Sequence, residues 1–190
     1  PWSEAFSTGH VVGRGNSGAV SGEVLDNIQS FITGRPKKLF LMIGTNDVGL
    51  GTISDTVIVD NIRQTINHIQ RESPRTEIYL QSVMPTRNGK RTMDHIARLN
   101  TMLKHLAAEK TVCFVDNQEA LMGMVGDELS FDRLHPHFYG NRIWCRLLAP
   151  YVGNGVKCLY PDTDALLYGG MKNSHGARLS TISQLSVKKR

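Results

Sequence analysis

The sequence predicts an α/β fold: a three-layer α/β/α sandwich with a parallel sheet, close to the flavodoxin-like class. Short apolar runs of strand length alternate along the chain with longer segments whose apolar residues recur at helical spacing. The run at residues 39–43, Leu-Phe-Leu-Met-Ile, is apolar throughout, which is typical of a strand covered on both faces. With 190 residues, 40% of them hydrophobic, the chain can bury one good core. We therefore expect one main domain with right-handed helical crossovers between its strands.

The N-terminal part is expected to hold a strand, a helix and a second strand. Residues 11–13 read as a short strand that runs into the glycine-rich loop of residues 14–18. A helix follows, which Gly34 ends. Its apolar positions recur at helical spacing and are Val24, Leu25, Ile28, Phe31 and Ile32. The strand at residues 39–43 comes next, followed by a loop that contains Gly49 and Gly51.

The rest of the domain alternates between helices and strands. Ser54 and Asp55 can cap a helix that ends at Ser73-Pro74. Strands are expected at residues 78–84 and 112–115, and a last helix at residues 138–151. The apolar stripes of the two middle helices are Val59, Ile62, Ile66 and Ile69, and then Ile96, Leu99, Leu103 and Leu106.

The tail after residue 152 has a different pattern, so we expect a domain at residues 1–152 and an extension or linker at residues 153–190. Residues 165–168 could form a short strand, but Gly169-Gly170 and a polar stretch interrupt the pattern.

Charge and composition argue against a nucleic-acid partner, a membrane span and a disulfide scaffold. The net charge is +5 and the pI about 9.3, but the basic residues are scattered, so a nucleic-acid partner is not expected. No stretch has the length of a membrane span. Cys113 and Cys145 lie in apolar patterns and are expected to be buried, and a third cysteine, Cys158, leaves an odd number that argues against a disulfide scaffold. The compartment (cytoplasmic, periplasmic or secreted) and the oligomeric state stay open.

Polar residues follow the strand at residues 39–43 directly, where ligands bind in open α/β sheets. These residues are Thr45, Asn46 and Asp47. The amide of Asn46 carries two N–H donors, which can stabilise the negative oxygen that forms when an acyl group is attacked. The alternative is that Gly-Thr-Asn-Asp serves only as a turn.

A second polar cluster lies just before the last helix. Asp132 and His135 have the spacing at which a carboxylate on the same loop can orient a histidine that serves as general base for a hydroxyl nucleophile. An incidental surface ion pair is one alternative. A metal site that includes His137 is another, but no further ligand is apparent, so no metal is expected.

These motifs together resemble the SGNH hydrolases, also called the GDSL esterase and lipase family, over roughly residues 1–152. The resemblance implies serine-type ester hydrolysis without a cofactor, with the Gly18 N–H and the Asn46 side chain as the oxyanion hole. It implies that His135 is the base and Asp132 its partner. We expect Asp47 to hold the loop. A small acyl ester, such as an acetylated sugar, is the expected substrate, because no loop is apolar enough to indicate a tunnel for a lipid chain.

One block of the family pattern is absent: no Gly-Asp-Ser occurs, so the nucleophile is not identified in this chain. Truncation upstream of Pro1 is the favoured explanation, and it would leave an unfilled strand position in the sheet. Alternatively, residues 165–170 supply the strand, with Ser174 near its end, or the protein is a non-catalytic relative that binds an acylated glycan. Four other hydroxyls lie near the expected site: Ser3, Ser7, Ser17 and Ser21. A plain flavodoxin or receiver domain is a further option, but no phosphate loop or acidic cluster supports it.

Overall fold

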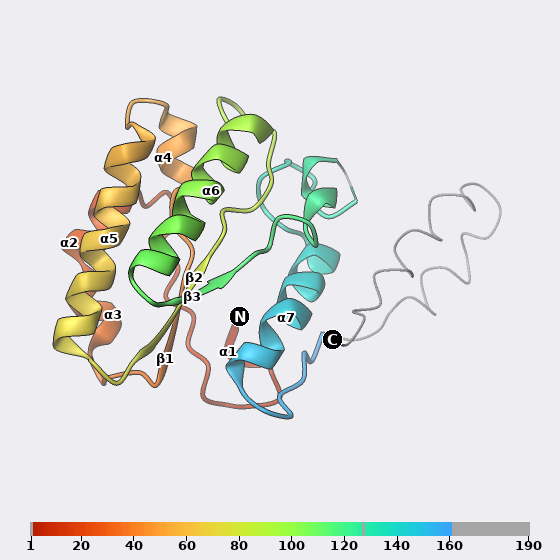
Figure 1. Cartoon of the computed structure of the whole chain (residues 1–190). Coiled ribbons are helices and arrows are strands. Elements are labelled where there is room, and N and C mark those ends of the chain that lie inside the picture. The colour runs from red at the N-terminus through yellow and green to blue at the C-terminus, as the bar shows by residue number, and fades with distance from the viewer. Residues whose placement is uncertain (1, 127, 161–190) are drawn as a thin grey trace, which may run out of the picture.

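The computed structural model describes residues 2–126 and 128–160, which form a parallel sheet between two layers of helices (Figure 1). The sheet contains β1 (Lys38–Leu41), β2 (Glu77–Gln81) and β3 (Cys113–Val115), in the order β1-β2-β3. Both pairings are parallel, with Leu41 opposite Leu80 and Gln81 opposite Val115. The predicted three-layer α/β/α architecture is confirmed.

One face of the sheet is covered by α5 (Asp55–Glu72) and α6 (Met93–Glu109), with α2 (Ser21–Asp26) and α3 (Ile28–Ile32) packed beside α5. The predicted apolar stripes of α5 and α6 are buried here, and Ile62 and Leu103 are fully inaccessible to solvent. Each such side chain contributes about 1.5–3 kcal/mol relative to an exposed one. The core of this face therefore fixes the positions from which the loops at the ends of the strands start.

The opposite face is covered by α7 (Phe138–Val152) and the short α1 (Trp2–Ala5). Cys145 is fully buried there, as the sequence predicted. Phe40 and Tyr79 point from neighbouring strands toward this layer, and their rings stack with centroids 4.7 Å apart. Alternate residues of the strands thus pack into two separate hydrophobic cores, one on each face of the sheet. This explains why consecutive residues of β1 are apolar.

The helix ends follow the predicted signals. Ser54 caps α5 by accepting a hydrogen bond from the Val57 N–H, and α5 ends at Glu72, before Ser73-Pro74. Thr92 caps α6 in the same way, through the His95 N–H. Side-chain oxygens satisfy backbone donors that the first turn of a helix leaves free.

Several element boundaries differ from the sequence predictions. Residues 11–13 form no strand, and Val12 is 68% exposed; among the described residues only β2 pairs with β1, so no neighbouring strand is there to pair with this segment. The helix expected across Val24–Ile32 is broken at Asn27. Residues 45–50, expected to be a loop, form the short helix α4 (Thr45–Leu50). A 3₁₀ helix at Met122–Val125 follows β3 and was not predicted.

The expectation that Cys113 is buried was wrong. Cys113 is the first residue of β3, and β3 pairs with β2 alone within the described part of the chain, so its thiol is exposed. The residue lies at the start of an outer strand, where the helices do not cover it.

Residues 153–160 pack against the beginning of the chain. Phe6 and Cys158 form an antiparallel bridge, flanked by hydrogen bonds from the Ser7 N–H to the Lys157 carbonyl at 2.9 Å and from the Leu159 N–H to the Ala5 carbonyl at 2.7 Å. The strand expected at residues 165–168 lies outside the described residues. Among residues 2–126 and 128–160, no helix combines the length and apolar character that crossing a membrane requires.

Candidate active site

The carboxyl end of β1 leads into α4 through a glycine that no other residue could replace without strain. Gly44 has a φ of +119°, and a Cβ there would lie 3.2 Å from the Leu99 side chain and 3.3 Å from that of Val83. The chain therefore makes a sharp turn at Gly44, where the backbone packs closely against core side chains. This turn places Thr45, Asn46 and Asp47 in the first turn of α4, at the rim of the sheet.

Asp47 is buried and binds the start of α2. Its two carboxylate oxygens each accept the Ser21 N–H at 3.0 Å, and Oδ1 also accepts the Ser21 hydroxyl at 2.6 Å. The Ser21 hydroxyl in turn accepts a hydrogen bond from the Asn61 amide at 3.0 Å. Asp47 thus holds both the backbone and the hydroxyl of Ser21, just after the glycine-rich loop, which supports the expectation that Asp47 holds the loop.

Asn46 meets the glycine-rich loop. Its Nδ2 donates to the Ala19 carbonyl at 2.9 Å, directly after Gly18, whose φ is +79°. Its Oδ1 accepts a hydrogen bond from Arg91 at 3.4 Å. The second N–H of the amide makes no hydrogen bond to any described residue. The structure thus brings the Gly18 loop and Asn46 together and leaves Asn46 one unused donor.

Asp132 and His135 form a hydrogen-bonded pair on the loop before α7. His135 Nδ1 lies 2.6 Å from Asp132 Oδ2, while Asp132 Oδ1 accepts the His135 N–H at 2.7 Å and the Leu134 N–H at 2.9 Å. Arg133, with a φ of 58°, makes the left-handed turn between them. These bonds, above all that from the His135 N–H and next that from its ring, hold the pKa of Asp132 well below its usual range. The carboxylate stays ionised and can stabilise an imidazolium.

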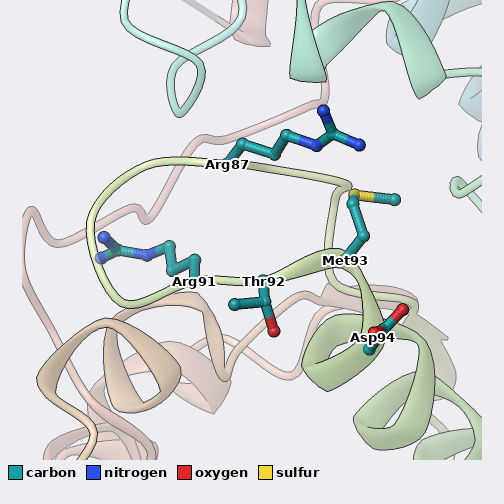
Figure 2. A pocket seen from close by; sticks show the side chains of 5 residues that line it. All are labelled: Arg87, Arg91, Thr92, Met93 and Asp94. Carbon is teal, nitrogen blue, oxygen red and sulfur yellow. The ribbon is translucent and has the colours of Figure 1, made fainter.

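The loop of residues 86–91 connects the two parts of the site. The Thr86 hydroxyl donates to the Arg133 carbonyl, and Asn88 Nδ2 donates to the Asp132 carbonyl at 2.9 Å. At its other end, the loop reaches α4, where Arg91 Nε donates to the Thr45 carbonyl at 2.9 Å. A hollow of about 300 Å³ lies at this loop, and Figure 2 shows the side chains that line it: Arg87, Arg91, Thr92, Met93 and Asp94.

Sequence reasoning missed the groups that hold the site together. Ser130 is buried and donates its hydroxyl to Asp132 at 3.0 Å, and Asn88 and Arg91 make the contacts described above. In the sequence, residues 86–92 follow a predicted strand and carry no further signal, since a hydrogen bond between groups more than 40 positions apart leaves no periodic pattern. Ser130 precedes Asp132 by two residues, a spacing at which short hydroxyls commonly bond nearby polar groups, and this could have indicated it.

No nucleophile is paired with His135 within the described residues. His135 Nε2 makes no hydrogen bond to residues 2–126 or 128–160. Ser21 is occupied by Asp47, and the Ser7 hydroxyl accepts the Lys157 N–H at 2.8 Å. Ser17 is exposed in the glycine-rich loop. Ser174 lies outside the described residues.

The metal alternative receives no support from the position of His137. Its Nδ1 accepts the Tyr139 N–H at 3.2 Å and caps α7, so this nitrogen is used by the helix. Within residues 2–126 and 128–160, no group of three or more potential metal-binding side chains is found.

The model of the GDSL-like lipase/acylhydrolase family matches residues 2–143, and the chain belongs to this family. A search of curated protein sequences found no significant match.

Solved structures share the fold. A protein from Streptococcus pneumonia described as a platelet activating factor is 28% identical with a TM-score of 0.71, over 77% of this chain and 74% of that one. An acetylxylan esterase from Geobacillus stearothermophilus is 22% identical with a TM-score of 0.64, over 75% and 72% of the two chains. A carbohydrate esterase family 3 protein from Talaromyces cellulolyticus is 23% identical with a TM-score of 0.63, over 73% and 68%.

Proposed function

We propose that the protein is a serine-type carboxylic ester hydrolase that removes small acyl groups, with acetylated carbohydrate as the first substrate class. One observation carries the proposal: the His135–Asp132 pair and the Asn46 amide are tied together by the loop of residues 86–91. A base on a carboxylate and a free amide donor are two of the groups that acyl transfer to a serine requires.

In the proposed mechanism, a serine hydroxyl attacks the acyl carbon while His135 Nε2 takes its proton. Asp132 holds Nδ1 and stabilises the imidazolium. The Gly18 N–H and the free Asn46 N–H donate to the oxyanion. His135 then returns the proton to the leaving alcohol, and water repeats the sequence on the acyl-enzyme. The source of the serine is open between residues upstream of Pro1 and Ser174.

The substrate class rests on the surroundings of His135. A hollow of about 320 Å³ is lined by aromatic rings close to it in sequence, together with one carboxylate. Its size suits a single sugar ring or a small acyl group better than a long acyl chain. Two structural neighbours are named for carbohydrate esters, which makes such esters the first to test. The lining residues are Glu128, Phe131, His137, Phe138 and Tyr139.

The test is hydrolysis by the natural full-length polypeptide of p-nitrophenyl acetate and of acetylated xylan, together with labelling by a fluorophosphonate probe. We expect turnover of both esters and one labelled serine, which peptide mass spectrometry locates either outside residues 1–190 or at Ser174. A protein that is inert and stays unlabelled would overturn the proposal.

The competing function is a module that binds an acylated glycan without hydrolysing it. It would show saturable binding of acetylated xylo-oligosaccharide by calorimetry, no released acetate and no serine in the residues directly upstream of Pro1. A Gly-Asp-Ser or Gly-Asn-Ser sequence there supports the enzyme instead.

A further inference from the structure

The Arg91 guanidinium lies between the two parts of the site. Its Nε is 2.9 Å from the Thr45 carbonyl, its Nη2 is 3.4 Å from Asn46 Oδ1, and its Nη1 is 3.4 Å from both the carbonyl and Oδ1 of Asn88. Figure 2 shows Arg91 and Arg87 extending from the loop in opposite directions. Arg91 therefore turns away from its neighbour toward α4.

We propose that Arg91 is a positioning residue that fixes the orientation of the Asn46 amide, an inference that rests on the esterase function proposed above. An asparagine amide can turn over, exchanging its oxygen and nitrogen. A guanidinium has five donors and no acceptor, so it can face only the oxygen of that amide. With Oδ1 held by Arg91, Nδ2 faces the Ala19 carbonyl with one N–H and keeps the other for an oxyanion.

The charge of Arg91 has a second effect on the same amide. A cation at Oδ1 draws electron density from the amide group, which makes the Nδ2 hydrogens better donors, because hydrogen bonds in a chain polarise one another. The developing oxyanion gains more from such a donor than the neutral ester does. Loss of Arg91 should therefore lower kcat more than it changes KM.

The space for the guanidinium is provided by Gly49. A Cβ at this position would lie 2.2 Å from Arg91 Nη2 and 2.3 Å from its Cζ. Gly49 belongs to the same short helix as Asn46, so the guanidinium lies directly against α4. A lysine could not replace it, because a single ammonium cannot reach Thr45, Asn46 and Asn88 in the planar arrangement that a guanidinium provides.

The same contacts continue to the base. Asn88 Oδ1 accepts a hydrogen bond from Arg91, and Asn88 Nδ2 donates to the Asp132 carbonyl at 2.9 Å. One line of hydrogen bonds thus runs from the Asn46 amide to the loop that carries His135.

A kinetic double-mutant cycle on the natural full-length polypeptide tests this role, using Arg91→Met, Asn46→Ala and the double variant on p-nitrophenyl acetate. We expect Arg91→Met to lower kcat by about 10-fold, a typical coupling for contacting residues, with little change in KM. In the Asn46→Ala background, the same change should have almost no effect. An equal loss in both backgrounds would overturn the proposal. Arg98→Met, at an exposed arginine on α6 that forms an ion pair with Asp55, is the matched control and should leave kcat unchanged.

A second readout does not depend on activity, so it separates failure of this inference from failure of the proposed function. The side-chain amide signals of Asn46 in a ¹⁵N-labelled sample are identified by their loss in Asn46→Ala. We expect Arg91→Met to shift and broaden them and to speed their exchange with water, while Arg98→Met leaves them in place. Unchanged Asn46 signals in a folded Arg91→Met protein would overturn the proposal even if the protein is an esterase, and altered signals would support it even if no ester is hydrolysed.

Discussion

The two parts of the candidate site are held in different ways. Asn46 stands on a helix that follows a core strand, next to the fully buried Asp47. Asp132 and His135 lie on a surface loop, with side chains 49% and 77% exposed. The first part is fixed by tertiary packing around Gly44 and by the bond of Asp47 to Ser21. The side chains of the second part are fixed by hydrogen bonds within six residues of the chain, while Thr86 and Asn88 bond the backbone carbonyls of Arg133 and Asp132.

Because of this difference, mutations in the two parts should have different effects on folding stability and on catalytic activity. A group held by tertiary contacts cannot be altered without disturbing the core, whereas an exposed group held by local bonds can be altered at little cost to folding. Changes on the Asp132–His135 loop should therefore affect activity more than stability, while changes around Asp47 should affect the fold first.

The largest expected effect is on the exposed base. His135→Ala should lower kcat for p-nitrophenyl acetate by about 10⁴-fold, since a general base contributes up to this factor. The midpoint of urea unfolding should stay the same, because the side chain is mostly in solvent. His105→Ala, at another exposed histidine, is the control and should keep full activity. A loss confined to KM would show that His135 binds substrate without moving a proton.

The next effect is on the oxyanion donor. Asn46→Ala should lower kcat by about 10²–10³-fold, the usual result of removing one such donor. Steady-state kinetics measure it, with Asn67→Ala on the exposed side of α5 as the matched change. If kcat is retained, other groups stabilise the oxyanion and Asn46 is not the oxyanion donor.

The third effect is on stability. Asp47→Asn should lower the free energy of unfolding by about 2–3 kcal/mol, because hydrogen bonds to a buried charged group are lost at Ser21. Urea denaturation followed by circular dichroism measures this. The same change at the exposed Asp132 should cost less than about 1 kcal/mol. Equal losses at both positions would contradict the distinction drawn here.

The smallest effect is the pH dependence of stability. Because hydrogen bonds hold the pKa of folded Asp132 well below its ordinary value of 3.8, the folded state favours the ionised carboxylate. Its contribution to stability is complete above that ordinary value and is lost as the pH falls through the lowered pKa. The difference in unfolding free energy between the natural protein and Asp132→Asn should therefore not shrink from pH 7 to about 5 and should shrink below 3.8. A difference that shrinks between pH 7 and 5 would contradict the lowered pKa.

Most of the architecture could be predicted because buried residues of a helix recur as apolar positions at regular spacing in the sequence. The stripes that include Ile62 and Leu103 identified α5 and α6, and both side chains are fully buried. The helix at residues 45–50 could not be predicted, since six residues are too few to show a period and two glycines in this region are typical of a loop. Cys113 shows the same limit: its residue type indicated burial, but its exposure depends on which strands pair.

The site was predictable only in part. The pairing of Asp132 with His135 follows from their spacing on one loop, and the structure places them 2.6 Å apart. The contact between Asn46 and Arg91 joins residues 45 positions apart, and no local pattern indicates it. The nucleophile is assigned neither by the sequence nor by the described residues.

The pairing of the two ends of the domain has a consequence for folding order. The strand pairs of the sheet join segments separated by α4 and α5 in one case and by α6 in the other, but the bond from the Lys157 N–H to the Ser7 hydroxyl spans 150 positions. Each doubling of the length of a closed loop costs about 0.6 kcal/mol more in chain entropy. Contacts between distant segments therefore form more slowly than contacts within the sheet. The ends should therefore join last and open first, and the rim that carries Asn46 and His135 can stay assembled while they do.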